Sequence, residues 1–304
     1  MMRTIGIIGL GHVGMTTAFN VVAQNLVDQL VLFETNTAKA NAEFLDIKDA
    51  LGAVPQQQTQ IIMNDYSALK TADCVVFAAG QGDATDDGDR NSEIKTTKKA
   101  VDEVLPHLLS SGFHGVLINI SNPCDVVTAY WQEKLTLPQN QVIGTGTMLD
   151  TNRMRRGVAE ALHISVADVA GYNLGEHGES QFTAWSTVHL LNQNEQAVKD
   201  LDQAAVEKAA RLGGWTIFDG KHYTSYGIAM TAVELIKAVM SDSHQIYALS
   251  YFDTAVQTYI GHLGKVGKHG IVEALDLTLT AAEQQKYQIS AKIIRENLAK
   301  MKTL

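Results

Sequence analysis

The 304-residue chain contains only two cysteines and four prolines, and its basic residues are fewer than its acidic ones. Two cysteines cannot build the disulfide framework of a small secreted protein. The 24 lysines and arginines against 33 aspartates and glutamates give a formal net charge of −9, the wrong sign for a general nucleic-acid binder. No apolar run reaches the roughly 18 residues that a membrane span requires.

Residues 1–4 lead directly into a strand-like segment without the layout of a signal peptide. We therefore expect a cytoplasmic protein that partners neither nucleic acid nor a membrane. What the chain does contain is an ordinary globular composition, with 45% apolar and 19% charged residues. Its length suits two fused domains, because domains cluster near ~100–150 residues.

The first half alternates short apolar segments with helix-length amphipathic stretches. Several of these segments lack a period of two, which is typical of strands buried on both faces. We expect strands at residues 5–8, 30–33, 74–79, 116–120 and, less clearly marked, 142–144. The alternation predicts an α/β fold with a doubly wound parallel sheet and right-handed crossovers, which is a Rossmann fold.

The second half has a different pattern. Residues 228–240 are apolar on nearly every side and predict a buried helix, and residues 281–304 predict an amphipathic closing helix. The change of pattern near residue 145 predicts a Rossmann domain at residues 1–145 and a mixed α+β catalytic domain at residues 146–304.

A glycine-rich turn, GLGHVG at residues 9–14, follows the first expected strand and opens a helix. Gly9 permits the tight turn, Gly11 lets a pyrophosphate approach the backbone, and Gly14 lets helix and strand pack closely. The helix N-terminus then faces the anion with free N–H groups. Glu34 ends the second strand twenty residues after Gly14, where an acid can bind ribose hydroxyls and repel a 2′-phosphate. These residues predict a site for NAD rather than NADP.

Four further segments contain side chains that can perform chemistry. Asn122 follows the expected strand at residues 116–120, at the edge where ligands of open α/β sheets bind. Asp150 and Arg153 are three residues apart, on one face if the segment is helical. His177 lies between glycines, where nothing forces it into a core, and Arg90 follows a long loop with several glycines.

In order and spacing, these motifs resemble those of the L-lactate/L-malate dehydrogenase family over the whole chain. The resemblance rests on GLGHVG, ISNPCDVVT, VIGTGTMLDTNRMR, GYNLGEHGESQ and YTSYGIA. Within that family the sequence is most similar to the L-2-hydroxyisocaproate dehydrogenases, through GYNLGEHGESQFTAWSTV and the unusual loop before Arg90. The resemblance implies an NAD-dependent oxidoreductase that reversibly reduces 2-oxo acids, branched or larger ones in particular, to L-2-hydroxy acids.

The resemblance also implies roles for single residues. His177 would be the general acid and base, since an imidazole exchanges a proton near neutral pH. Asp150 would fix the tautomer of His177 and stabilise its imidazolium. Arg153 would hold the substrate carboxylate through two parallel hydrogen bonds. Arg90 would move in with its loop, polarise the substrate carbonyl and exclude water.

The remaining implied contacts surround the substrate and the cofactor. Asn122 would orient the substrate oxygen and the nicotinamide region, Thr224 would line the substrate pocket, and Ile228 would pack on the nicotinamide ring. NAD would carry the hydride, and no metal is implied. Family members pair through a helix around residues 43–51 and the helix at 228–240, so the resemblance implies a homo-oligomer, a dimer or more readily a tetramer.

The loop before Arg90 departs from the family's pattern. Lactate enzymes have a glutamine, and malate enzymes an arginine, shortly before the loop arginine, and neither occurs here. Residues 83–89 contain four aspartates instead, which disfavours a second substrate carboxylate, as in malate, by Coulomb repulsion. The small Ala84 and Thr85 leave room for a larger substrate side chain, but the aspartates fit a solvated surface equally well.

Three other functions stay open on the sequence. An L-lactate dehydrogenase would prefer pyruvate, and the relative kcat/KM for pyruvate and 2-oxo-isocaproate separates it from the main hypothesis. A related NAD-dependent glycosidase would need a metal, but the mostly uncharged residues around Cys124 favour a structural thiol. A nucleotide-sensing Rossmann module would not require the four reactive side chains together.

Tyr223, Tyr226 and Trp185 are interpreted as packing residues.

Overall fold

The computed structural model describes residues 2–54, 58–80, 90–191 and 196–304, with the backbone alone for residues 90–92. The strands described are β1 (Thr4–Ile8), β2 (Gln29–Phe33), β3 (Gln60–Met63), β4 (Cys74–Phe77), β5 (Val116–Asn119), β6 (Val142–Gly144), β7 (Val169–Leu174), β8 (Phe182–Leu190), β9 (Gln245–Asp253), β10 (Thr258–Gly267) and β11 (Gly270–Ala274). The helices are α1 (His12–Ala23), α2 (Thr37–Ala53), α3 (Arg90–Ser111), α4 (Cys124–Lys134), α5 (Met148–Leu162), α6 (Gln196–Lys199), α7 (Gln203–Lys221), α8 (Tyr226–Ser241) and α9 (Ala281–Thr303), with the short 3-10 helices η1 (Tyr66–Thr71), η2 (Gln139–Gln141) and η3 (Val166–Asp168).

Strands β1 to β6 form the parallel part of a large sheet, in the spatial order β3-β2-β1-β4-β5-β6. β1 lies between β2 and β4, with Ile5 opposite both Leu30 and Cys74. All residues of β1 and β2 are buried, which explains their uninterrupted apolar sequences. This strand order is that of the doubly wound dinucleotide-binding folds, and the predicted Rossmann fold class is confirmed.

The predicted strands correspond to β1, β2, β4, β5 and β6. The sequence pattern does not predict β3, an edge strand whose four residues are exposed or half-buried. A strand at the edge of a sheet is covered less completely, so it has no buried apolar run to mark it.

Three strands that the pattern also misses extend this sheet beyond residue 145. β9 pairs antiparallel with β6 at Gly144 and Ser250, and β10 and β11 follow it in an antiparallel meander. β10 contains Gly261, Gly264 and Gly267, and glycine is depleted in strands, which hides it from pattern reading. One sheet therefore runs across the expected boundary, and the division into domains stays a prediction.

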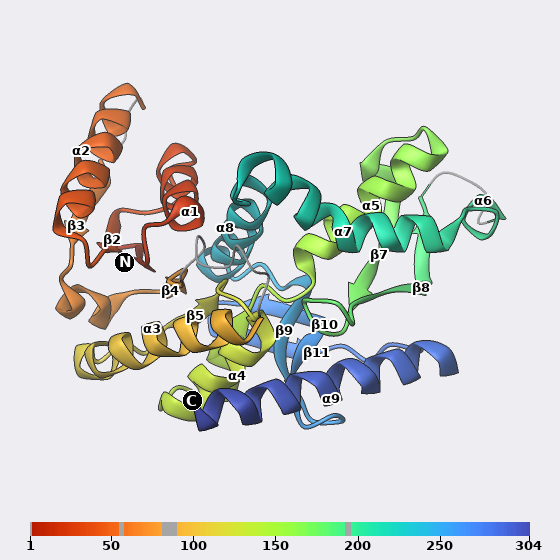
Figure 1. Cartoon of the computed structure of the whole chain (residues 1–304). Helices are drawn as coiled ribbons and strands as arrows, with labels where there is room; N and C mark the ends of the chain where they lie inside the picture. The colour runs from red at the N-terminus through yellow and green to blue at the C-terminus, as the bar shows by residue number, and fades with distance from the viewer. Residues whose placement is uncertain (1, 55–57, 81–89, 192–195) are drawn as a thin grey trace.

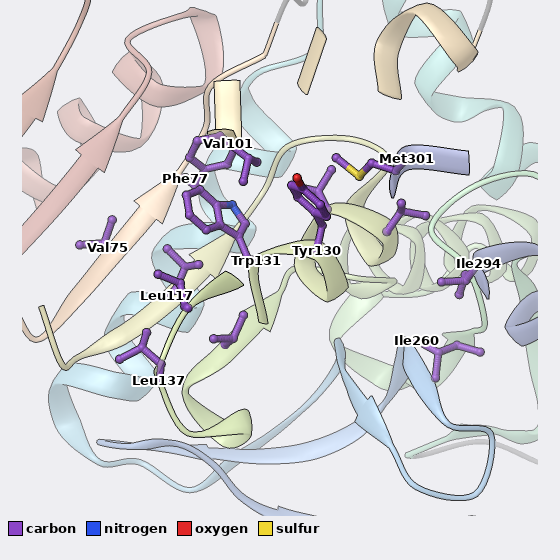
Figure 2. Close-up of a cluster of buried hydrophobic side chains, with 14 of the residues drawn as sticks. Val75, Phe77, Val101, Leu117, Tyr130, Trp131, Leu137, Ile260, Ile294 and Met301 are labelled. Carbon is purple, nitrogen blue, oxygen red and sulfur yellow. The ribbon is translucent and has the colours of Figure 1, made fainter. Parts of the chain in front are cut away.

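Helices cover both faces of the sheet (Figure 1). On one face α3, α4 and α9 enclose a core that Figure 2 shows. In it the rings of Trp131 and Phe77 are nearly perpendicular, with their centroids 5.0 Å apart. On the other face α1 packs against α8, whose buried residues confirm the predicted helix at 228–240. α9 confirms the predicted closing helix and begins with a capping box of Thr280 and Glu283.

A smaller unit lies beside the sheet. β7 and β8 form a two-stranded antiparallel sheet, and α5 and α7 pack on it around Met154, Val158, Val188 and Val206. The turn between β7 and β8 projects toward the carboxyl ends of the parallel strands, where a backbone pair joins Gly175 to Gly261. None of the helices in the described ranges is long and apolar enough to cross a membrane.

Candidate active site

The phosphate loop joins the end of β1 to the start of α1, and its three glycines meet different constraints. Gly9 has a φ of +95°, and a Cβ there would lie 2.6 Å from the backbone nitrogen of Ala79. A Cβ on Gly14 would lie 1.9 Å from the carbonyl oxygen of Gly9, so only glycine permits this packing of helix on strand. Gly11 has nothing within 4 Å of its Cβ position. The open cradle at the N-terminus of α1 fits a pyrophosphate.

Glu34 follows β2 directly and lines the same cavity as the loop. Its Oε1 accepts a hydrogen bond from the backbone N–H of Asn36 at 3.0 Å, and its Oε2 lies 3.4 Å from Nζ of Lys39. The Asn64 amide bonds to both backbone groups of Glu34 at 3.0 Å each. The carboxylate is thus fixed at the lining of this cavity, and Lys39 partly offsets its charge.

Asp150 is a fully buried carboxylate that two other predicted residues share. Its Oδ2 lies 2.6 Å from Nδ1 of His177, and its Oδ1 accepts a hydrogen bond from Nη1 of Arg153 at 3.1 Å. Asp150 and Arg153 lie on the first turns of α5, as their spacing predicts for a helix, whereas His177 comes from the turn between β7 and β8. The sheet topology therefore joins a helix and a distant turn in one cluster.

Burial and charge act in opposite directions on this cluster. Burial alone would lower the pKa of His177, but the Asp150 carboxylate raises that pKa above its ordinary value. Burial also opposes ionisation of Asp150, yet His177 and Arg153 hold the pKa of this carboxyl below its ordinary range. The arrangement favours a protonated imidazole beside an ionised carboxylate, which suits a proton donor near neutral pH.

The other predicted binding residues line one cavity of about 1380 Å³ together with this cluster. Asn122 is exposed in the turn between β5 and α4. Thr224 precedes α8, and Ile228 lies in its first turn against the core of that face. Every predicted site residue other than Gly14, and other than Arg90 with its undescribed side chain, therefore lines the same cavity.

Of Arg90 and the acidic loop before it, the structure describes only the backbone of Arg90. Arg90 is the first residue of α3, and its side chain lies outside the described part of the chain. Residues 83–89, with Ala84, Thr85 and the four aspartates, lie outside the described residues as well. The expectations about loop closure and about malate therefore stay predictions.

One buried acid at the site escapes the sequence pattern. Asp125 is the second residue of α4 and is fully buried, and its Oδ2 accepts a hydrogen bond from the backbone N–H of His177 at 2.7 Å. The signal for it was available, because Asp125 is the one charged residue in the motif ISNPCDVVT. What the motif cannot show is that this acid lies beneath a turn fifty-two residues away.

A face of α7 also lines the cavity and was not predicted. Arg211, Gly214, Trp215 and Phe218 lie at helical spacing toward it. A Cβ on Gly214 would lie 3.2 Å from the guanidinium of Arg153, so α7 passes directly over the predicted carboxylate-binding residue. Arg211 lies 4.0 Å from Glu179, which lines the cavity too.

Tyr223 was interpreted as a packing residue, and its ring packs at the wall of the cavity. It lines the cavity, and its ring stacks on His12 of the phosphate loop with centroids 3.6 Å apart and planes 6° from parallel. Nζ of Lys221 lies 4.7 Å from the centroid of the Tyr223 ring. The stack joins the phosphate loop to the turn before α8.

Cys124 fits the expected structural role. It is buried, accepts a hydrogen bond from the backbone N–H of Gly146 at 3.3 Å, and burial raises the pKa of its thiol to about 12. Such a thiol is neither a ready nucleophile nor a ready metal ligand. Within the described ranges, no group of three or more histidines, cysteines, aspartates or glutamates could hold a metal ion.

The Rossmann sheet, the glycine cradle and the buried acid–imidazole pair define an NAD-dependent oxidoreductase that acts on 2-hydroxy acids. Two family models match the chain: the lactate/malate dehydrogenase NAD binding domain at residues 3–144, and the lactate/malate dehydrogenase alpha/beta C-terminal domain at residues 147–304. The chain belongs to the lactate/malate dehydrogenase family, and NAD is its cofactor.

Similar proteins match over nearly the whole chain. L-lactate dehydrogenase 1 of Bifidobacterium longum is 33% identical over 305 residues, which cover 96% of this chain and 95% of the relative. L-lactate dehydrogenase 3 of Bacillus cereus is 31% identical and covers 97% and 96%. A lactate dehydrogenase from a Medee basin deep-sea metagenome library superposes with a TM-score of 0.91 at 31% identity, over 99% of this chain and 100% of that one. These relatives are named for lactate, so a hydroxyisocaproate dehydrogenase stays a prediction.

Proposed function

We propose that this protein reversibly interconverts pyruvate and L-lactate with NAD. The observation that carries the proposal is the cluster in which one buried carboxylate contacts both a histidine and an arginine at the dinucleotide cavity. Its relatives are named lactate dehydrogenases. Their names support pyruvate as the substrate, rather than the larger 2-oxo acids that the sequence suggested.

His177 is the proton donor and acceptor in this scheme. Asp150 holds its Nδ1, so Nε2 is the nitrogen that gives a proton to the substrate oxygen during reduction and takes it back during oxidation. The raised pKa of His177 keeps the imidazole protonated at the start of reduction. NAD, when bound, supplies or accepts the hydride.

Arg153 binds the substrate carboxylate, and its position supports the role. Its side chain is about one-eighth exposed, at 12%, and one of its nitrogens is held by Asp150. A planar guanidinium so fixed presents its other nitrogens to a carboxylate with little loss of conformational freedom. Asn122 orients the substrate oxygen, Thr224 lines the pocket, and Arg90 polarises the carbonyl.

The cofactor contacts follow from the cradle. Gly9 and Gly11 face the pyrophosphate at the start of α1, Gly14 lets α1 pack closely behind them, and Glu34 binds the adenosine ribose. Ile228 supports the nicotinamide side of the cavity.

A second candidate is the reduction of branched or larger 2-oxo acids, as in the L-2-hydroxyisocaproate dehydrogenases. The α7 face favours it, because Trp215 and Phe218 offer apolar surface on the helix that crosses Arg153. A substrate held by its carboxylate at Arg153 would extend its side chain beside this face.

NADH consumption across a panel of 2-oxo acids tests both candidates. We expect the highest kcat/KM for pyruvate, with lower values for 2-oxo-isocaproate and phenylpyruvate and the lowest for oxaloacetate. A preference for 2-oxo-isocaproate would replace the first candidate by the second. No NADH oxidation with any 2-oxo acid would overturn both.

We also propose that the enzyme is a cytoplasmic homo-oligomer, a tetramer or a dimer. Apolar side chains are exposed on the helices through which the family pairs: Leu45 on α2 at 60%, and Tyr226 and Met230 on α8 at 70% and 37%. Faces of this kind are typical of surfaces that another copy covers. Sedimentation velocity at micromolar concentration tests this, and a monomer would contradict it.

A further inference from the structure

The backbone of His177 is held as firmly as its ring. Gly175, two residues before it, exchanges two backbone hydrogen bonds with Gly261 of β10, at 3.0 and 2.9 Å. On the other side the backbone N–H of His177 donates to Oδ2 of Asp125 at 2.7 Å. The turn therefore rests on a strand at one point and on a carboxylate at the other.

Asp125 is an unusual group to find in that place. It is 1% exposed, at the second position of α4, where the helix N-terminus favours a negative charge. Its Oδ1 is buried, and the hydroxyl of Ser250 faces the carboxylate from β9 and lowers its pKa. The neutral amide of an asparagine could accept the same hydrogen bond from the backbone N–H of His177. The hydrogen bond alone therefore does not explain why a charged group is buried here.

We propose that Asp125 is a positioning residue that holds the backbone of His177 and, through its charge, keeps the imidazole protonated for reduction. Two carboxylates then contact one histidine, with Asp150 at the ring and Asp125 at the backbone. Each stabilises the imidazolium more than the neutral ring. The proposal deepens the proposed function, on which it rests for the role of His177.

The charges around the pair fit this assignment. Burial raises the pKa of Asp125 to about 6, although Ser250 and the His177 backbone lower it. Because this pKa is still below neutral pH, most of the carboxylate is ionised there. The pKa of His177 is raised by Asp125 as well as by Asp150. The other titratable or charged groups that face the two are Cys124 on α4, Glu176 on the turn, Arg153 on α5 and Tyr287 on α9.

Asp125→Asn separates the charge from the hydrogen bond. The amide oxygen can still accept from the backbone N–H of His177, and the amide nitrogen can donate to the Ser250 hydroxyl, so we expect the variant to fold. Without the charge, the pKa of His177 should fall, because one of the carboxylates that raise it is gone. Asp125→Ala removes the hydrogen bond too and should lower kcat further.

The first measurement does not depend on turnover. The rate at which diethyl pyrocarbonate modifies His177, followed by peptide mass spectrometry across pH, reports the pKa of this imidazole because only the neutral ring reacts. The midpoint should move to lower pH in Asp125→Asn and farther in Asp150→Asn. The control is Asp102→Asn, a carboxylate on α3 that bonds to Lys98 and Tyr130, and it should leave the midpoint in place.

The second measurement is the pH profile of 2-oxo acid reduction. Reduction needs protonated His177, so its rate falls as pH rises through the pKa, and Asp125→Asn should shift that fall to lower pH with NADH affinity unchanged. An unmoved midpoint in both measurements would overturn the proposal, even if the variant were less stable. A shifted modification midpoint in a protein that reduces no 2-oxo acid would overturn the proposed function and leave the role of Asp125 intact.

Discussion

The phosphate loop and the catalytic cluster are built in opposite ways. The loop occupies residues 9–14, uses backbone N–H groups, and is limited by steric contacts between glycines and their neighbours. The cluster joins the carboxylate of Asp125 to the backbone of His177 and the carboxylate of Asp150 to its ring, across up to fifty-two residues, and is governed by buried charge. A change in the loop should therefore act through packing and cofactor affinity, and a change in the cluster through proton and substrate affinity.

The largest expected effect is that of His177→Asn. Without a proton donor, kcat for pyruvate reduction should fall by roughly 10²–10⁴-fold. A fluorescence titration with NADH should give a nearly normal Kd, because the loop that holds the dinucleotide is unchanged. Turnover within tenfold of the wild type would show that the proton comes from elsewhere.

The second-largest expected effect is the loss of kcat/KM in Arg153→Lys. An ammonium cannot make the paired contacts of a guanidinium, so kcat/KM for pyruvate should fall by roughly 100-fold, mostly through KM. Arg156→Lys is the matched control on the same helix, since Arg156 is 57% exposed and bonds only weakly to Glu160 at 3.9 Å. Equal effects of the two changes would remove Arg153 from the carboxylate role.

The loop side of the comparison is tested by Gly14→Ala against Gly11→Ala. The first places a Cβ 1.9 Å from a carbonyl oxygen and should lower the free energy of unfolding by about 1–3 kcal/mol, measured by urea denaturation. The second has open space and should leave stability unchanged while weakening NADH binding. Similar losses of stability in both variants would contradict the different roles assigned to the glycines.

The smallest expected effect is that of Glu34→Ala on cofactor choice. Removing the carboxylate frees Lys39, 3.4 Å away, to attract a 2′-phosphate, so the preference of kcat/KM for NADH over NADPH should fall by roughly tenfold. In the double variant Glu34→Ala/Lys39→Ala, kcat/KM with NADPH should lose most of the increase expected for Glu34→Ala. A wild-type enzyme that uses both cofactors equally would show that Glu34 does not face the 2′-position.

Much of the fold could be read from the sequence, and the omissions have a common cause. Five parallel strands and α8 were predicted from runs of apolar residues, and α9 was predicted from one apolar face. β3 was missed because an edge strand is incompletely buried, and β10 because its glycines resemble a loop. These strands are selected by the neighbours they pair with, which a local pattern does not contain.

The same division holds at the site. Strand, glycines, helix and acid follow one another in the phosphate loop, so spacing alone predicts which residues face the pyrophosphate. Asp150, Arg153 and His177 were found through resemblance to a family, and only their geometry shows that one carboxylate holds both partners. The α7 face and the contact of Tyr223 with His12 appear in the structure alone.

By itself the sequence determined a Rossmann fold and NAD as the cofactor, and it predicted the reacting side chains, because these depend on short-range periodicity and on motifs with few uses. The tertiary structure decided that Asp125 lies beneath His177 and that α7 crosses Arg153. Those contacts join segments that are distant in the chain, and they depend on which surfaces are buried together. Burial is also what gives the two carboxylates their influence on one imidazole, since charges act more strongly where water is excluded.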